Sequence, residues 1–251
     1  MIEQLSSRQK EILEVLSENW NVSVAEISKN LKVSSVTIRG DLDVLAENGF
    51  IVRSRGGATP AINQRILQRQ SQSVQEKNRI AKAAAELIQN GDHIMISAGT
   101  TTALIGKYLL GKQNIKIVTN SIMFLQYARI NPHLDITLVG GEYRPEAEAL
   151  VGPIALRELE QFHVKIALLG TDGFSIENGL TANLVEMAEV VKKMAAKAEQ
   201  NVFLADSSKF DRAGFAHIQP ITKTSAIITD SNLMQDSKDI LEEKGLSITL
   251  V

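Results

Sequence analysis

Apolar residues recur at three- and four-residue intervals through the first 50 residues, which is the spacing of amphipathic helices. Val24, Ile27 and Leu31 share one face of a short helix, and a turn follows at residues 32–33. We expect the next helix to direct four apolar residues toward a core, namely Val36, Ile38, Leu42 and Leu45. An earlier helix near residues 7–16 would close that core.

Polar residues gather at the N-terminal end of the third helix. Ser34 or Ser35 is placed to cap it, because a serine oxygen accepts hydrogen bonds from the free N–H groups there. Ser35, Thr37 and Arg39 then lie on the outward side. A helix that enters the major groove N-terminus first brings small hydroxyl residues and an arginine to bases and phosphates.

A basic hairpin follows this helix. Residues 50–53 alternate apolar and polar positions as a strand does, and Arg53 and Arg55 precede a Gly-Gly pair at residues 56–57. A basic hairpin of this kind suits contact with phosphates. Residues 1–57 are therefore predicted to form a winged helix-turn-helix that binds double-stranded DNA.

Two other interpretations of residues 1–57 stay open, a three-helix scaffold and a winged helix that binds protein. The segment is slightly acidic, whereas a DNA-binding domain is typically basic. Its charges are segregated, however, because acidic residues gather in the first helix and cations on the recognition helix and wing. A dimer would present that basic face twice, which favours DNA.

The pattern changes beyond a segment rich in Gln, Asn and Ser, residues 58–73, which we expect to be a linker, with or without a helical part. Over residues 74–251, helical patterns alternate with short apolar runs that end in polar or glycine-rich turns. The runs are His93–Ser97, Ile115–Thr119, Asp135–Val139, Val164–Leu169, Asn201–Ala205, Ser225–Thr229 and Ser247–Val251. Such alternation predicts an α/β domain with a parallel sheet over residues 74–251.

Ligands of open α/β sheets bind outside the carboxyl ends of the strands. Gly99, Thr100, Thr101 and Thr102 lie between a strand and a helix expected over residues 102–110. Glycine allows close approach of the backbone, and free N–H and hydroxyl groups suit an anion such as phosphate. An ordinary helix cap is the alternative interpretation of this turn.

Other turns at the same edge add groups to that site. Lys209 would supply a compact positive charge for phosphate. Asn120, Asp172 and Asp206 could accept hydrogen bonds from sugar hydroxyls. Together the turns predict a pocket for a small phosphorylated polyol.

Composition narrows the function classes without choosing one. Hydrophobic residues make up 44% of the chain, and the net charge of −2 creates no general attraction to nucleic acid or membrane. The absence of cysteine excludes disulfides and thiolate chemistry and fits a reducing cytoplasm. Four scattered histidines have no metal-ligand spacing, so we expect no metal, cofactor or catalytic residue. We also expect no signal peptide and no membrane span, because the start is polar and no apolar run approaches roughly 20 residues.

Several motifs occur together and in order: VSSVTIRGDLDVLAENGFIVRSRGGA, SAGTTT, VTNS, VGGEYR, GTDGF followed by GLT, and LADSSKF. With these motifs the chain resembles the DeoR family of transcriptional regulators over nearly its whole length. The resemblance implies a bacterial repressor, usually of a sugar-catabolic operon, whose C-terminal domain binds a phosphorylated sugar intermediate. It also implies a sensor fold related to ribose-5-phosphate isomerase and CoA-transferase-like domains, and a homo-oligomer, either dimer or tetramer.

The resemblance assigns contacts to particular positions. Its DNA contacts would be Ser34, Ser35, Thr37, Arg39, Arg53 and Arg55. Its effector contacts would be Gly99, Thr100, Thr101, Thr102, Asn120, Gly141, Asp172 and Lys209. The chain departs from the family pattern at Gly40, where a second basic residue is common, and at residues 97–98, where Ser-Ala replaces the common Asp-Ser. The first departure removes a phosphate contact, and the second removes a carboxylate for a sugar hydroxyl.

Two other functions compete with a ligand-responsive repressor. A sugar-phosphate isomerase with a DNA-binding head would use Asp172 and Lys209, but it also needs a proton-shuttling carboxylate facing the substrate. Glu186 and Glu189 are candidates, and neither lies in a motif that fixes it there. The third function is a sensor that binds DNA only with a partner protein. The chain has no conspicuous apolar helix beyond those its fold needs, so self-association is the simpler expectation.

Overall fold

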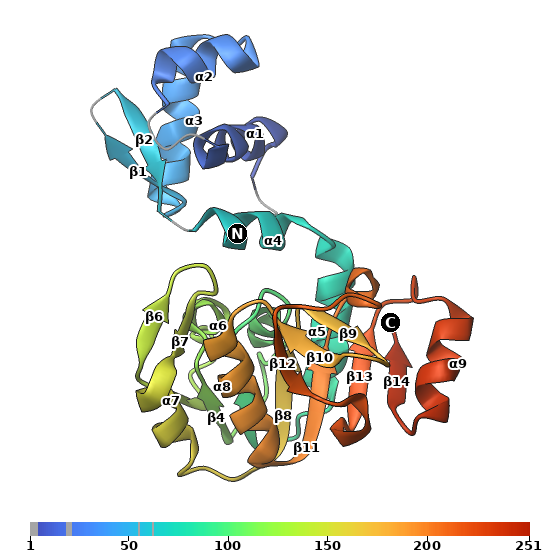
Figure 1. Cartoon of the computed structure of the whole chain (residues 1–251). Coiled ribbons are helices and arrows are strands. Elements are labelled where there is room, and N and C mark those ends of the chain that lie inside the picture. The colour runs from blue at the N-terminus through green and yellow to red at the C-terminus, as the bar shows by residue number, and fades with distance from the viewer. Residues whose placement is uncertain (1–4, 19–21, 55, 62) are drawn as a thin grey trace. The chain divides into compact units, whose positions relative to one another are not determined.

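The computed structural model describes residues 5–18, 22–54, 56–61 and 63–251 (Figure 1). The chain divides into two compact units, Met1–Gln72 and Ser73–Val251, which we call unit 1 and unit 2. Each unit has its own hydrophobic core. Within the described residues, no helix combines the length and the apolar character needed to span a bilayer.

Unit 1 is a helix-turn-helix followed by a hairpin and a further helix. Its elements are α1 (Ser7–Glu18), α2 (Val24–Leu31), α3 (Ser35–Glu47), β1 (Ile51–Ser54), β2 (Gly57–Pro60) and α4 (Gln64–Ser71). The three helices meet through side chains that are fully buried, among them Leu16, Ile27 and Ile38. β1 and β2 pair antiparallel and form the wing. The winged helix-turn-helix predicted from the apolar spacing is thus present.

Residues 58–73, expected to be a linker with or without a helical part, contain the end of the wing and a helix. Their first residues belong to β2, and α4 follows, with Asn63 capping its start by accepting a hydrogen bond from the backbone N–H of Arg65 at 2.9 Å. Ile66 and Leu67 of α4 are buried, and Leu67 belongs to the core of unit 1. The polar composition of the segment concealed this one apolar pair.

Unit 2 is built on a seven-stranded sheet in the described part of the chain, ordered β14-β13-β11-β8-β3-β4-β5. The strands are β3 (His93–Ile96), β4 (Ile115–Thr119), β5 (Leu134–Leu138), β8 (Val164–Gly170), β11 (Ala198–Leu204), β13 (Ala226–Thr229) and β14 (Ser247–Leu250). All neighbours pair parallel. Each strand overlaps one of the predicted apolar runs, which confirms the predicted sheet. Nearly continuous apolar runs are typical of parallel strands covered on both faces.

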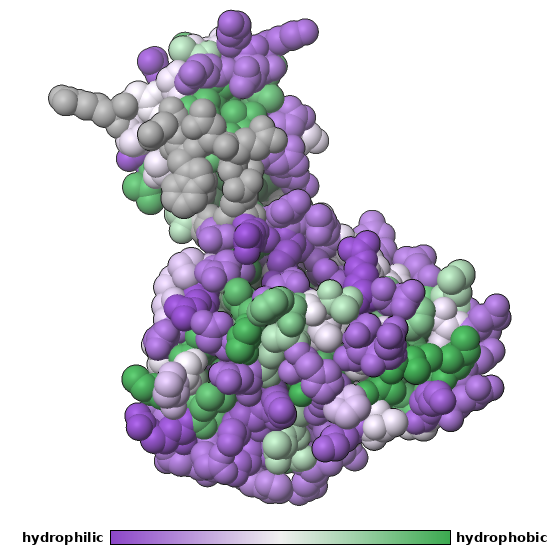
Figure 2. Space-filling model, in the orientation of Figure 1, coloured by the Kyte–Doolittle hydropathy of each residue, from purple (hydrophilic) through white to green (hydrophobic). Residues whose placement is uncertain are grey.

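Helices cover the sheet on both faces, with α8 on one and α5 on the other (Figure 1). The helical elements are α5 (Val74–Glu86), η2 (Thr102–Tyr108), α6 (Ile122–Ala128), α7 (Gly152–Leu159), α8 (Val185–Ala196), η3 (Ser207–Lys209), η4 (Ile221–Lys223) and α9 (Gln235–Glu243). Short antiparallel strands lie outside the main sheet: β6 (Glu142–Arg144), β7 (Ala149–Val151), β9 (Gly173–Ser175), β10 (Gly179–Ala182) and β12 (Ala216–Gln219). On the visible face of unit 2, hydrophobic residues lie in small groups among hydrophilic ones (Figure 2).

Candidate nucleic-acid interface and ligand site

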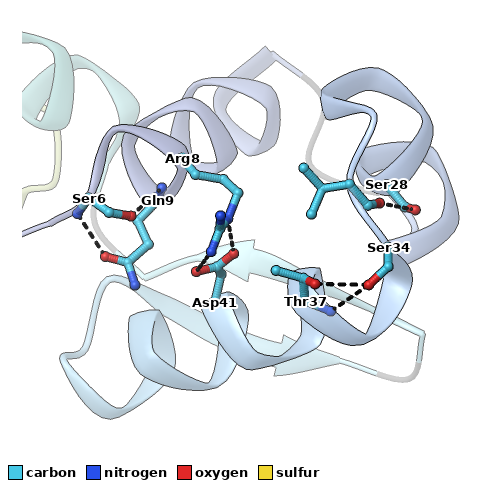
Figure 3. Close-up of polar contacts among 8 residues, drawn as sticks. Ser6, Arg8, Gln9, Ser28, Ser34, Thr37 and Asp41 are labelled. Atoms are coloured by element: carbon cyan, nitrogen blue, oxygen red, sulfur yellow. Dashed lines mark hydrogen bonds and ion pairs between the residues drawn. The ribbon is translucent and has the colours of Figure 1, made fainter.

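The start of α3 is fixed by Ser34 (Figure 3). Its Oγ accepts a hydrogen bond from the backbone N–H of Thr37 at 3.2 Å, so Ser34 and not Ser35 is the cap. The hydroxyl oxygens of Ser34 and Thr37 also lie 2.8 Å apart and share a hydrogen bond. Ser34 is exposed, whereas Ser35 and Thr37 are half-buried. The cap therefore occupies two of the hydroxyls expected to face DNA.

The arginines expected to face DNA differ in their surroundings. Arg39 is exposed, and it forms no hydrogen bond or ion pair with any residue that the structure describes. Arg53 on β1 pairs with the exposed Asp43 of α3 at 3.3 Å, which ties the wing to the recognition helix. Arg55 lies outside the described residues. A phosphate would therefore meet Arg39 directly and would compete with Asp43 for Arg53.

Val36 corrects the expected core of unit 1, because 77% of its surface is exposed. Ile38 and Leu42 are fully buried as predicted. Two residues rotate a helix by roughly 200°, so Val36 and Ile38 cannot share a face. The 3.6-residue period, applied strictly, would have placed Val36 outside.

A partly buried ion pair joins α3 to α1 (Figure 3). The guanidinium of Arg8 donates from Nε and Nη2 to the carboxylate of Asp41, at 2.5 and 3.2 Å. Asp41 is buried, and its hydrogen bond raises the pKa of the half-exposed Arg8. Since α1 packs behind the recognition helix, this pair helps to set how α3 is presented.

The far end of α3 is closed by Gly49. Gly49 has a φ of 74°, in the left-handed region that glycine adopts without strain. Its N–H donates to the carbonyl of Ala46 and that of Phe50 to the carbonyl of Leu45, both at 2.9 Å. This pair of bonds is the Schellman motif that satisfies the last carbonyls of a helix.

In unit 2 the sheet reverses its direction of growth between β3 and β8. From β3 the chain runs through β4 to the edge strand β5, and then builds β8, β11, β13 and β14 on the other side. Open α/β sheets bind ligands at such a point, outside the carboxyl ends of the strands. The backbone N–H of Gly170, at the end of β8, donates to the hydroxyl of Ser97 at 2.9 Å. The turns after β3 and β8 are therefore in direct contact.

The threonines after β3 divide into two kinds. Thr102 is fully buried, and its hydroxyl bonds the carbonyls of Ser97 at 2.7 Å and Gly99 at 3.2 Å, so it holds the turn. Thr100 and Thr101 are also largely buried, but their hydroxyls bond to none of the residues that the structure describes. The following element, η2, is a 3-10 helix and not the α-helix expected over residues 102–110. An anion at this turn would therefore meet the hydroxyls of Thr100 and Thr101 rather than the N-terminus of an α-helix.

Asn120 and Gly141 contact the backbone of the protein itself. Asn120 is fully buried: its Oδ1 accepts from the N–H of Ala98 at 2.8 Å, and its Nδ2 donates to the carbonyl of Leu150 at 3.0 Å. Gly141 has a φ of 146°, and an added Cβ would lie 2.4 Å from the carbonyl oxygen of Val151. Asn120 joins β7 to the turn after β3, and Gly141 lies close against β7. A ligand would rest against the backbone that they position.

Lys209 is positioned by a carboxylate from the neighbouring strand. Asp230, fully buried after β13, accepts from the N–H of Ser207 at 2.6 Å, from the Ser207 hydroxyl at 3.0 Å and from the N–H of Asn232 at 3.1 Å. Burial alone raises the pKa of Asp230, but these hydrogen bonds outweigh it and the net pKa is lowered. Ser207 begins η3, which ends at the half-buried Lys209. No role was predicted for Asp230, although matching Asp-Ser pairs follow β11 and β13.

Asp172 lies in the turn after β8. Its Oδ2 accepts a hydrogen bond from the N–H of Asn183 at 2.9 Å, and its own N–H donates to the carbonyl of Thr181 at 2.9 Å. Its side chain is half-buried. Asp206, expected to accept sugar hydroxyls, is buried and accepts from the Ser208 hydroxyl.

The β6–β7 hairpin is joined to α8 by an ion pair. Arg144 donates to Glu186 at 2.7 Å and to Glu142 at 3.2 Å, and the bond from Arg144 lowers the pKa of Glu186. A carboxylate held in its ionised form by an arginine is a poor proton shuttle near neutral pH. No cluster of metal-ligating side chains occurs among the described residues.

Comparison with known proteins matches both units to one family. The DeoR-like helix-turn-helix domain matches residues 8–64, and the DeoR C terminal sensor domain matches residues 72–231. The HTH-type transcriptional regulator YulB of Bacillus subtilis is 31% identical over 98% of this chain and 97% of its own. The glycerol-3-phosphate regulon repressor of Escherichia coli is 29% identical over 98% of each chain. Among solved structures, the ribose 5-phosphate isomerase from Plasmodium falciparum covers 55% of this chain and 54% of its own, with a TM-score of 0.39 and 17% identity.

Proposed function

Because this chain belongs to the DeoR family of transcriptional regulators, we propose that it represses a sugar-catabolic operon and responds to a phosphorylated sugar intermediate. Its named sequence relatives are regulators, and it is a regulator and not the isomerase considered above. The strongest support is that one chain joins an outward-facing recognition helix to an α/β unit whose sheet reverses beside a threonine-rich turn. One relative is named as a repressor of a glycerol-3-phosphate regulon, which favours an effector of the same class.

In this proposal unit 1 binds operator DNA. Arg39 contacts phosphate or a base edge, and Arg53 contacts phosphate after leaving Asp43. Ser35 is the remaining polar group of the first helical turn, since Ser34 and Thr37 complete the cap. Arg55 is proposed to contact phosphate from the wing. A homo-oligomer would present two recognition helices to two operator half-sites.

In this proposal unit 2 binds the effector at the reversal between β3 and β8. Thr100 and Thr101 donate to phosphate, and Lys209 neutralises its charge. Asp172 accepts a sugar hydroxyl. Gly99, Thr102, Asn120 and Gly141 shape the site through the backbone that they hold. The neutral Ser97, where the family often has aspartate, leaves fewer acceptors for sugar hydroxyls.

Effector and operator would be coupled by linkage. A ligand changes operator affinity only as far as it binds the DNA-bound and free states with different affinities, and the coupling is reciprocal. We propose that the effector lowers the affinity for the operator, so that its binding relieves repression.

The test begins with selection of a duplex site from a random pool by the full-length protein. The selected duplex is then titrated with sugar and polyol phosphates, with the unphosphorylated compounds as controls. We expect one phosphorylated compound to release the DNA and also to raise the melting temperature of the free protein. A ligand at 100 times its dissociation constant adds about 2.7 kcal/mol to stability. Failure to select any site, or equal responses to free sugars, would refute the proposal.

A further inference from the structure

Val36 is the second residue of α3, and it is the most exposed of the large apolar residues of that helix. A lone exposed valine is ordinary on a protein surface. The position of Val36 is what distinguishes it. Side chains of a helix lean toward its N-terminus, and a recognition helix inserts that end first. Val36 therefore occupies the part of α3 that goes deepest into a groove.

The neighbours of Val36 leave its two methyl groups accessible. Residues three and four positions along a helix share a face, which here means Arg39 and Gly40. Gly40 has no side chain, and a Cβ built there would meet no atom within 4 Å. The hydroxyls of Ser34 and Thr37 are engaged with each other. The leading turn of α3 thus presents the apolar surface of Val36, beside the half-buried Ser35 and the hydroxyls of the cap.

Only one group in the major groove of unmodified DNA matches such a surface. Thymine alone carries a methyl group there, at C5, whereas the other bases present hydrogen-bond donors and acceptors. We propose that Val36 contacts the 5-methyl group of a thymine in each operator half-site and so determines sequence specificity. This inference rests on the proposed function.

The experiment removes methyl groups either from the thymine or from the side chain at position 36. In the duplex selected by the full-length protein, each thymine is replaced in turn by deoxyuridine, which keeps base pairing and lacks only the 5-methyl group. The same duplexes are measured with Val36→Thr, which keeps one methyl group, and with Val36→Ser, which differs from it by that methyl. Val44→Ser is the matched control, because Val44 is an exposed valine near the opposite end of α3.

We expect one thymine per half-site at which deoxyuridine weakens binding by about fourfold for the natural protein, from the value of one buried methylene. Val36→Thr and Val44→Ser should keep that sensitivity. Val36→Ser should bind the thymine duplex more weakly and bind the two duplexes equally, which is the non-additivity that marks a direct contact.

Two results would overturn the inference while leaving the proposed function intact. One is a selected site that contains no thymine, or none whose methyl group affects affinity. The other is a deoxyuridine effect of the same size in Val36→Ser as in the natural protein. If no site is selected at all, the proposed function fails instead.

Discussion

The hydroxyl of Ser97 accepts a hydrogen bond from the backbone N–H of Gly170 at 2.9 Å, and this bond joins the two turns at the reversal of the sheet. Ser97 is fully buried, so no water replaces the bond when the hydroxyl is removed. Ser97→Ala should lower the free energy of unfolding by about 1–2 kcal/mol, measured by chemical denaturation. Ser247→Ala, at an exposed serine, is the control and should have no effect beyond about 0.5 kcal/mol. Equal losses of unfolding free energy in Ser97→Ala and Ser247→Ala would contradict the role of Ser97 in joining the two turns.

Lys209 is predicted to bind the phosphate of the effector. A hydrogen bond to a charged group contributes about 1.5–3 kcal/mol, so Lys209→Ala should weaken binding of the phosphorylated effector by roughly 10- to 100-fold. Operator affinity without effector should not change. The control is Lys223→Ala, at an exposed lysine of η4. Calorimetric titration checks the prediction, and an unchanged affinity in Lys209→Ala would remove this residue from the site.

The parallel sheet was predictable because β3, β4, β8 and β13 are mostly buried and are nearly continuous apolar runs. The edge strand β5 and the first residues of β11 are more exposed, and there the predicted bounds differ from the observed ones. Each run ends in a turn that the sequence also marks. The β6, β7 and β9 strands have three residues each, which is too short to show a period. The apolar pair of α4 was not recognised in the sequence because polar residues surround it.

The sequence predicts where the candidate site lies, but not how each of its side chains is used. The residues at 99–102, 172 and 209 follow strands, and strand order alone brings them to one edge. Whether an amide faces a ligand or its own backbone depends on packing that no short pattern records. Asn120 illustrates this, because both ends of its amide bond main-chain groups of distant segments.

Asp41 and Asp43 on α3 form a matched pair for testing how the recognition helix is held. Asp41 is buried and receives two hydrogen bonds from Arg8, whereas Asp43 is exposed and meets Arg53 at 3.3 Å. Asp41→Asn should destabilise unit 1 by about 1–2 kcal/mol. Asp43→Asn should cost no more than about 0.5 kcal/mol. Hydrogen exchange of the α3 amides would measure both, and similar protection in the two variants would refute the prediction.

Gly40 and Gly49 should respond to alanine with opposite signs. Gly40 is inside α3 with open space at its Cβ, so Gly40→Ala should raise stability by up to about 1 kcal/mol through helix propensity. Gly49 has a φ of 74°, where a Cβ costs about 1–2 kcal/mol, so Gly49→Ala should lower the stability of the protein. Chemical denaturation checks both. A destabilising Gly40→Ala would show that the helix is constrained there by a contact other than its own backbone.

Asp230 should make stability depend on pH in a defined direction. Its folded-state pKa is lowered, so its contribution is complete above the unfolded pKa of about 3.9 and is lost as the pH falls through the folded value. Asp230→Asn should therefore be destabilising at pH 7, and the difference from the natural protein should shrink as the pH falls below about 4. Asp236→Asn, at an exposed aspartate of α9, is the control. Comparing the two variants cancels the titration of all other groups. A gap that is constant with pH, or that widens on acidification, would mean that the charge of Asp230 does not hold η3 and Lys209 in place.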